Sequence, residues 1–268
     1  MPDTAPPPAP DMAVVSACNS EQVLAHNLAR SPMLAQVPLH TEWGAPSAAA
    51  ALNRGLDATS AEIVVLAHQD VYLPQGWDAL LRARIAEVAA LDPNWALIGP
   101  FGVGLDERHH GPVWSSSIGM VIGRVALAPV PVQSFDEMVI VLRRSSGLRF
   151  DEALGGWHMY GTDIVTQARM RGLGAWVTAL PCVHNDRFHG VLGPDFAEGY
   201  GAMQRKWAGH LPLRTPVIQI TRSAVDLYRW RWRTWRGKGF MRTMAVGTDT
   251  PAEDLALRCG WGDLASAA

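Results

Sequence analysis

The chain has 268 residues, of which 48% are hydrophobic and 18% are charged, and its formal net charge is -2. These values are typical of a globular protein and exclude a disordered or fibrous chain. The three cysteines lie far apart and form no CxxC pair, which excludes a disulfide framework or a thiolate zinc site and favours a reducing compartment.

The amino-terminal stretch Pro2 to Pro10 has no positive charge and no apolar core. We therefore expect no ordinary secretory signal here and interpret residues 1–11 as a disordered tail. No later apolar run reaches the length of a membrane span. A cytoplasmic protein is the resulting expectation.

From residue 12 onward, short apolar runs alternate with helical patterns. We expect strands at Met12 to Ala17, Val37 to Thr41, Glu62 to Ala67 and Trp95 to Phe101, with helices at Ser47 to Leu56 and Gln75 to Leu91. Further short strands and helices are expected at Ile118 to Ile122, Glu137 to Leu142, Thr162 to Arg171, Ala175 to Leu180 and Asp195 to Trp207. Such alternation predicts right-handed βαβ units. The expected fold is a single α/β domain at residues 12–210, with helices flanking a mostly parallel sheet.

The sharpest local feature follows the buried run that ends at Ala67. His68 and Asp70 are spaced i, i+2, so both side chains can face one cleft beyond the carboxyl end of the strand, where ligands of such sheets bind. A carboxylate assisted by an imidazole suits a hard divalent cation. A structural interpretation is also open, in which Asp70 caps the turn before Pro74 and His68 lies in the core.

A second candidate segment runs from Gly155 to Ile164. Its glycines lead into a helix with Asp163 in the first turn, where the acid can simply be a favourable cap or partner of the helix dipole. Trp157 precedes this helix and can stack on a sugar or uracil ring, although tryptophans of α/β domains are more often core residues.

Two pairs of adjacent acids, Asp136-Glu137 and Asp151-Glu152, suggest the acid and nucleophile of a hydrolase. Adjacent side chains of a strand point to opposite faces, which weakens that interpretation. No Walker loop and no GxGxxG follows the first strand, so kinase-like and Rossmann-dehydrogenase interpretations lack their phosphate-binding glycines.

Six segments between Met12 and Trp207 are each weak signals alone but follow one another in a characteristic order. They are Val14-Val15-Ser16-Ala17-Cys18-Asn19, Ala50-Ala51-Leu52-Asn53-Arg54-Gly55-Leu56, His68-Gln69-Asp70-Val71, Phe150-Asp151-Glu152, Tyr160-Gly161-Thr162-Asp163-Ile164 and Val183-His184-Asn185. In this order the chain resembles the family 2-like glycosyltransferases with the nucleotide-diphospho-sugar transferase (GT-A) fold.

The resemblance implies a metal site and a catalytic base. Asp70 matches the carboxylate that holds Mn²⁺ or Mg²⁺ on the donor diphosphate, and His184 matches a late histidine ligand. His68 stands where the common motif has its first aspartate, so it would touch metal, ribose or phosphate. Asp163 matches the acid that deprotonates the acceptor hydroxyl, which gives inversion at the anomeric carbon.

The resemblance also implies nucleotide contacts. Ser16, Ala17 and Asn19 follow the first strand where members of the family line the uridine pocket, and Asn53 or Arg54 resembles a later contact to the donor. Trp157 is the best placed aromatic residue for stacking. A UDP-sugar is therefore the expected donor.

Residues 211–268 form an expected C-terminal extension that is partly helical, basic and aromatic. The stretch Arg222 to Arg242 combines arginine with tryptophan, which suits an anionic lipid surface at the inner face of the membrane or a phosphorylated acceptor. Nucleic acid also suits such a composition, but we do not expect it as a partner. A helix that packs its tryptophans on the core fits equally well.

The sequence thus predicts a metal-dependent, hexosyltransferase-type glycosyltransferase that acts on a glycan, lipid or protein acceptor. One alternative is a nucleotide-binding protein of the same fold that has lost turnover, which the altered His-x-Asp motif allows. A second alternative is a nucleotidyltransferase or phosphohydrolase on a similar sheet.

Overall fold

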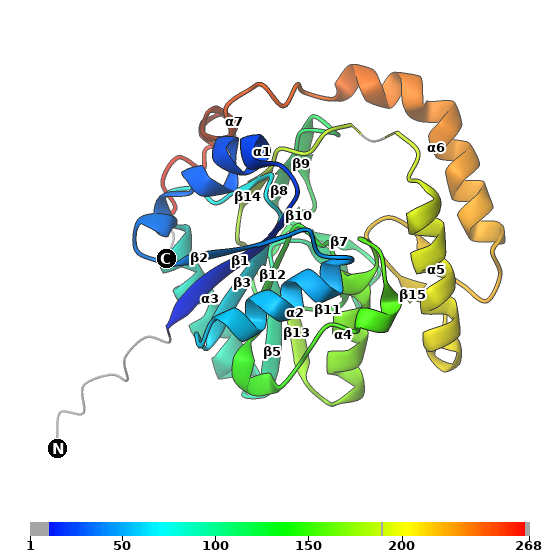
Figure 1. Ribbon diagram of the computed structural model, residues 1–268, viewed down its shortest axis with the longest axis horizontal. Helices are drawn as coiled ribbons and strands as arrows, with labels where there is room; N and C mark the ends of the chain where they lie inside the picture. The colour runs from blue at the N-terminus through cyan, green and yellow to red at the C-terminus, as the bar shows by residue number, and fades with distance from the viewer. Residues whose placement is uncertain (1–10, 189, 266–268) are drawn as a thin grey trace.

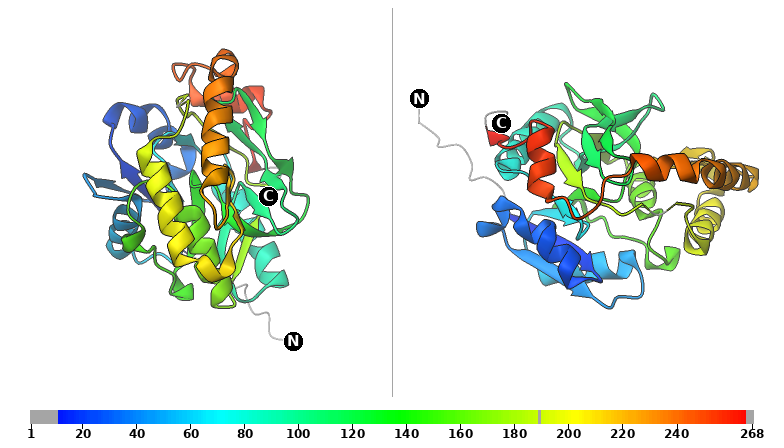
Figure 2. Two further views of the ribbon diagram at one scale, coloured as in Figure 1. Left: turned by 90° about the vertical axis from the view of Figure 1, so that its right-hand side faces the viewer. Right: turned by 90° about the horizontal axis from the view of Figure 1, so that it is seen from above.

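The computed structural model describes residues 11–188 and 190–265. In these residues helices pack on both faces of a large sheet, as Figure 1 and Figure 2 show. Apart from Asp11, the tail expected at residues 1–11 lies outside the described residues.

The described residues build a ten-stranded sheet. In order across it, the strands are β10 (Arg124–Val125), β7 (His109–Gly111), β6 (Gly102–Gly104), β11 (Val130–Phe135), β13 (Gly174–Val177), β5 (Trp95–Gly99), β12 (Val139–Arg143), β3 (Ile63–Ala67), β1 (Met12–Cys18) and β2 (Leu39–Trp43). The α/β class expected from the sequence is confirmed, but the sheet is mixed rather than mostly parallel. The reason is that β12 inserts between β3 and β5 and runs antiparallel to both, and β11 is antiparallel to β13 and β6.

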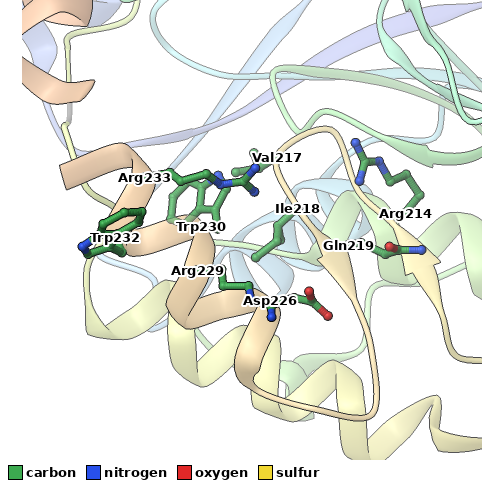
Figure 3. Close-up of a pocket in the computed structure, with 9 residues that line it drawn as sticks. All are labelled: Arg214, Val217, Ile218, Gln219, Asp226, Arg229, Trp230, Trp232 and Arg233. Atoms are coloured by element: carbon green, nitrogen blue, oxygen red, sulfur yellow. The ribbon is translucent and has the colours of Figure 1, made fainter. Parts of the chain in front are cut away.

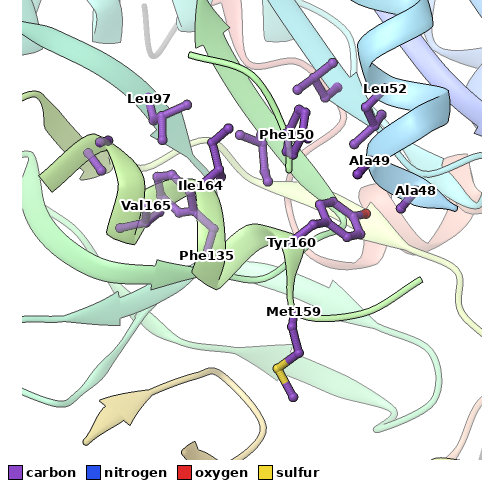
Figure 4. Close-up of a cluster of buried hydrophobic side chains, with 14 of the residues drawn as sticks. Ala48, Ala49, Leu52, Leu97, Phe135, Phe150, Met159, Tyr160, Ile164 and Val165 are labelled. Atoms are coloured by element: carbon purple, nitrogen blue, oxygen red, sulfur yellow. The ribbon is translucent and has the colours of Figure 1, made fainter. Parts of the chain in front are cut away.

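The two faces of this sheet bury different helices. Helices α2 (Ala48–Ala58) and α4 (Tyr160–Met170) contribute to one hydrophobic cluster, and α3 (Trp77–Leu91) contributes to the other. Because strand side chains alternate, Val64 and Leu66 of β3 join the first cluster while their neighbour Val65 joins the second. Figure 4 shows part of the first cluster, around Phe135, Phe150 and Ile164.

A second, four-stranded sheet lies beyond β3. It contains β4 (Val71–Tyr72), β14 (Cys182–His184), β8 (Val113–Ser115) and β9 (Met120–Ile122), in that order. The short helix α1 (Glu21–His26) follows β1, and α7 (Ala252–Arg258) packs on the second sheet. This contact forms a third cluster, made by Tyr72, Val183, Ala252, Leu255 and Ala256.

The part of the chain after residue 190 begins with α5 (Pro194–Lys206), a hairpin of β15 (Leu213–Arg214) and β16 (Gln219–Ile220), and the long helix α6 (Val225–Met244). Leu213, Ile220 and Leu227 belong to the same hydrophobic cluster as α4. Helix α6 runs beside α5 on the outside of the molecule (Figure 2). None of the helices in the described residues is both long and apolar enough to cross a membrane.

Gly55 offers a test of how closely α2 packs on β1. A Cβ atom at Gly55 would lie 2.2 Å from Cγ1 of the buried Val15. We expect Gly55→Ala to lower the free energy of unfolding by roughly 1–3 kcal/mol, because overpacking forces the helix away from the sheet. Chemical denaturation measures this, with Gly237→Ala as the control, since nothing lies within 4 Å of a Cβ at Gly237 of α6. An equal or higher stability of Gly55→Ala would contradict the packing described.

Candidate metal and nucleotide site

Five of the residues expected to bind ligand line a pocket of about 280 Å³ at the carboxyl ends of β1 and β3. Its walls come from five segments of the chain. They are Ala17, Cys18 and Asn19; Ala48 and Leu52; Leu66 to Asp70; Glu137; and Trp157, His158 and Tyr160. Of the residues predicted from sequence, this pocket therefore contains Ala17, Asn19, His68, Asp70 and Trp157.

Two residues of the pocket lining, His68 and Asp70, form a candidate metal centre together with His184. Suitable ligand atoms of His68, Asp70 and His184 all lie within 4.8 Å of one another. His68 Nδ1 is 3.9 Å and His184 Nε2 is 3.3 Å from Asp70 Oδ1. His184 comes from the end of β14, which pairs with β4 in a register that sets His184 opposite Val71.

The tautomer of His68 is set by Tyr160. The Tyr160 hydroxyl donates a hydrogen bond to the carbonyl of Glu137 at 3.2 Å, and His68 Nε2 lies 2.7 Å from the same hydroxyl oxygen. Because the hydroxyl proton is used toward Glu137, His68 Nε2 is the donor to Tyr160. Nδ1 then keeps its lone pair on the side of Asp70, which is the form a metal ligand requires.

The electrostatics of the cluster fit a bound cation. Burial alone would raise the pKa of Asp70, but His184 and His68 together outweigh it and hold that pKa well below its usual range. Burial would lower the pKa of His184, but Asp70 and Asp186 raise it to about 10. Burial lowers the pKa of His68.

One oxygen of this cluster lacks the partner that burial normally demands. Asp70 Oδ1 is buried and, within the described residues, accepts no hydrogen bond of regular geometry, although His184 Nε2 lies 3.3 Å away. An unsatisfied buried carboxylate oxygen is costly, and a further ligand at the site removes that cost. Together with two imidazoles, it is a donor set that a divalent cation accepts. The three residues therefore fit the metal that the sequence predicts.

Asp186 supports the cluster from behind. It lies 4.0 Å from His184 Nδ1 and accepts hydrogen bonds from the Ser115 hydroxyl at 3.1 Å and the Ser117 amide at 3.0 Å. A carboxylate on the far nitrogen of a ligand histidine orients its ring. No sequence pattern singled out Asp186.

Gln69, in the loop between β3 and β4, links this loop to the residues that follow β1. Its Oε1 accepts hydrogen bonds from the amides of Asn19 and Ser20 at 3.0 and 3.1 Å, and its Nε2 donates to Asn19 Oδ1. The residue lies within the His68-Gln69-Asp70-Val71 motif, but no pattern in the motif predicts this bridging role.

Two predicted nucleotide contacts lie outside the pocket lining. Ser16 is fully buried within β1. Asn53 is buried and clamps a neighbouring segment, donating to the Phe150 carbonyl and to Glu152 and accepting from the Phe150 amide. Asn53 therefore holds the chain that leads toward Trp157 and is not among the residues that face the pocket.

Asp163, the expected base, is also absent from the pocket lining. Its side chain is buried in α4 and accepts hydrogen bonds from Trp207 Nε1 at 2.8 Å, Lys206 Nζ at 2.9 Å and Gln167 Nε2 at 2.8 Å. Lys206 also pairs with Asp151 at 2.6 Å. Asp163 lies in the first turn of α4, as the sequence predicts, and its carboxylate also ties α4 to α5.

Glu137 is the carboxylate, besides Asp70, that lines the pocket. Burial and the neighbouring Asp136 raise its pKa to about 8. Its Oε1 lies 3.4 Å from the Gly161 amide that donates to it, and its Oε2 is 4.0 Å from His158 Nδ1. From the sequence, Asp136 and Glu137 are expected as neighbours in a strand, whose side chains point to opposite faces. Strand β12 begins only at Val139, so this alternation does not apply to the pair.

Sequence comparison with known proteins finds a partial relative of this chain and no family. No family model matches the chain. A Fuscovulum blasticum protein described as ATP synthase subunits region ORF 6 is 28% identical over 155 residues, which are 54% of this chain and 60% of that protein. The chain thus matches less than two thirds of that relative's length.

Two solved glycosyltransferase structures are similar to this chain. GalNAc-T7 with UDP, GalNAc and Mn²⁺ superposes with a TM-score of 0.52 and 11% identity, over 95% of this chain and 58% of that chain. The mannosyltransferase PcManGT from Pyrobaculum calidifontis, in complex with GDP-Man and Mn²⁺, gives 0.44 and 14%, over 96% and 79%, which is too distant to carry an argument. The first likeness shows that the chain has a GT-A fold.

We expect Asp163→Ala to destabilise the protein without weakening metal or nucleotide binding. The change leaves Trp207 and Gln167 without an acceptor and removes one of two partners of Lys206, a loss of roughly 2–3 kcal/mol in the free energy of unfolding. Thermal unfolding with and without Mn²⁺ and UDP measures both effects. The control is Asp254→Ala in the first turn of α7, where the side chain is exposed and the cost should stay below about 1 kcal/mol. Unchanged stability of Asp163→Ala would refute the structural role.

Proposed function

We propose that this protein is a metal-dependent glycosyltransferase that uses a nucleoside-diphosphate sugar, with a UDP-sugar as the donor. The observation that carries the proposal is the convergence of ligand atoms of His68, Asp70 and His184 within 4.8 Å of one another, with Asp70 Oδ1 buried beside both imidazoles. It lies beside a pocket at the carboxyl ends of β1 and β3, which is where ligands of α/β sheets bind. The GT-A fold agrees with this assignment.

The residues divide into two groups around the pocket. Asp70, His184 and His68 would hold the cation, which supplies a Lewis acid for the charge that develops on the departing diphosphate. Ala17 and Asn19 would receive the nucleoside, with Asn19 held in place by Gln69. Trp157 lines the same pocket with an exposed fraction of 43%, so its ring is available for stacking on the donor.

We assign the general base to Glu137 in preference to Asp163. The resemblance favours Asp163, but three donors already occupy its buried carboxylate. Glu137 lines the pocket, and its raised pKa of about 8 is near working pH, which suits a group that must accept a proton and later release it. The acceptor hydroxyl would lose its proton to Glu137 as it attacks the anomeric carbon, with inversion.

Metal dependence of nucleotide binding tests the donor assignment. We expect Mn²⁺ to tighten UDP binding by about 10-fold or more, equivalent to about 1.4 kcal/mol, and Asp70→Ala or Asp70→Asn to remove most of this gain because the bridging charge is lost. Isothermal calorimetry with Mn²⁺ and with chelator measures it. Asp249→Ala, at an exposed loop position, should behave as wild type. Equal UDP affinity with Mn²⁺ and chelator would rule out the proposed donor site.

The pH dependence of turnover tests Glu137. A base works only when deprotonated, so hydrolysis of the UDP-sugar by water should rise with pH through a midpoint near 8. Glu137→Gln, which mimics the protonated form, should lower this rate by about 10²-fold or more and leave UDP binding intact.

Asp163→Asn is the comparison for that experiment. If it abolishes hydrolysis while Glu137→Gln retains the wild-type rate, the base is Asp163. If wild type binds UDP with Mn²⁺ but neither hydrolyses nor transfers sugar with any acceptor, the protein is a binding module of the same fold.

A further inference from the structure

Helix α6 places an aromatic stripe on the outside of the molecule. Tyr228, Trp232 and Trp235 are spaced i, i+4, i+7, which sets them on one side of the helix. Their exposed fractions are 67%, 56% and 57%, although each carries a large apolar ring. The opposite side of the helix carries Trp230, which packs against the core and stacks on Phe196. Three exposed aromatic rings in one row are an unusual surface for a protein in water.

Basic residues flank this stripe on both sides. Within α6 there are six of them against the single acid Asp226, namely Arg229, Arg231, Arg233, Arg236, Lys238 and Arg242. The Arg236 guanidinium lies 4.8 Å from the centre of the Trp232 ring, and Lys238 Nζ lies 5.9 Å from the Trp235 ring. The whole chain has a formal net charge of -2, so positive charge is concentrated at this helix.

A groove continues the basic surface beside the helix, and Trp232 of the stripe also lines it. It has a volume of about 590 Å³ between α6 and the β15–β16 hairpin, and Figure 3 shows the residues that line it. Arg214 comes from the hairpin and Arg229 and Arg233 come from α6, so three guanidinium groups line one groove. Its one acid, Asp226, accepts a hydrogen bond from the Thr221 hydroxyl. Guanidinium groups in this number suit a phosphate.

We propose that α6 docks the protein on an anionic lipid surface. Aromatic rings with a polar edge lie at the headgroup level of a bilayer, and flanking arginines and lysines bind the phosphates of anionic lipids. The helix has 20 residues and so is about 30 Å long, enough to lie flat on the surface with the stripe facing the lipid. The Arg214, Arg229 and Arg233 groove then receives a headgroup phosphate.

Shape favours this occupant over a nucleic acid, which carries the same negative charge. Stacking of successive bases requires several free rings in one groove. Tyr228 and Trp235 are not among the residues that line the groove beside α6. Trp230 does line it, but its ring is already stacked on Phe196. The docking does not depend on the proposed transferase activity, because its residues are separate from the metal and nucleotide pocket.

Co-sedimentation of the full chain with lipid vesicles tests the proposal. At about 0.1 M salt we expect binding to vesicles that contain phosphatidylglycerol, weak binding to phosphatidylcholine alone, and a marked loss at about 1 M salt, where the screening length falls to about 3 Å. Two multiple variants should each weaken binding. The aromatic variant is Trp232→Ala with Trp235→Ala, and the basic variant is Arg229→Gln with Arg233→Gln and Arg236→Gln. The basic variant should bind about 100-fold more weakly, because each basic residue at an anionic surface contributes a factor of about five.

Matched controls change exposed residues elsewhere and should bind as wild type. The aromatic variant is matched by Leu91→Ala with Leu105→Ala, and the basic variant by Arg108→Gln with Arg169→Gln and Arg258→Gln, all at exposed positions. UDP binding with Mn²⁺ reports that each variant is folded around its pocket. The proposal is overturned if wild type does not sediment with the anionic vesicles, or if controls and α6 variants lose binding equally. It is also overturned if the chain retains single-stranded RNA but not the vesicles, in which case α6 is a nucleic-acid surface.

Discussion

The pairing of β4 with β14 is the constraint on which the candidate site depends. It sets His184 opposite Val71, and the Asn185 amide donates to the Asp70 carbonyl at 2.9 Å, so two distant parts of the chain meet with their ligand atoms together. Two-residue strands have little stability alone. Here β14 also pairs with β8, and α7 packs on Tyr72 and Val183. Residues near the end of the chain therefore stabilise the segments that carry Asp70 and His184.

The charge balance of the cluster explains how buried ionisable groups coexist there. His184 has its pKa raised to about 10 by Asp70 and Asp186, so at neutral pH its proton offsets the Asp70 carboxylate. A buried ion pair of this kind is tolerated because neither charge is left alone. Since a ligand histidine must be neutral, a bound divalent cation would replace the His184 proton and add one further positive charge. The Asp70 carboxylate is thus compensated with His184 protonated and would be compensated with a cation bound.

Many of the pocket residues at the carboxyl ends of the strands could be predicted from the sequence, and the exceptions have physical causes. The alternation of strands and helices placed Asn19 and Asp70 at the carboxyl ends of neighbouring strands, where the structure has them. The direction of β12 could not be predicted, because a fully buried apolar run has the same pattern in a parallel or an antiparallel neighbourhood. The role of Asp163 depends on Lys206 and Trp207 from another helix, and no local pattern reports such a contact. Glu137 depends on the same kind of tertiary placement.

Helix α6 is fixed at both ends to elements that carry the site, which gives its surface a defined relation to the pocket. Near its beginning, Trp230 stacks on Phe196 with ring centres 5.3 Å apart, and Phe196 in turn contacts the pocket residue His158 at 5.4 Å. Just after its end, the Val246 amide donates to the Ser116 carbonyl, and the Ser116 hydroxyl donates to Asn185, next to His184. Helix α6 is thus held near its beginning by packed rings and just after its end by a backbone hydrogen bond, so it is packed as part of the domain. A surface that binds α6 would therefore lie at a defined distance and orientation from the candidate metal centre.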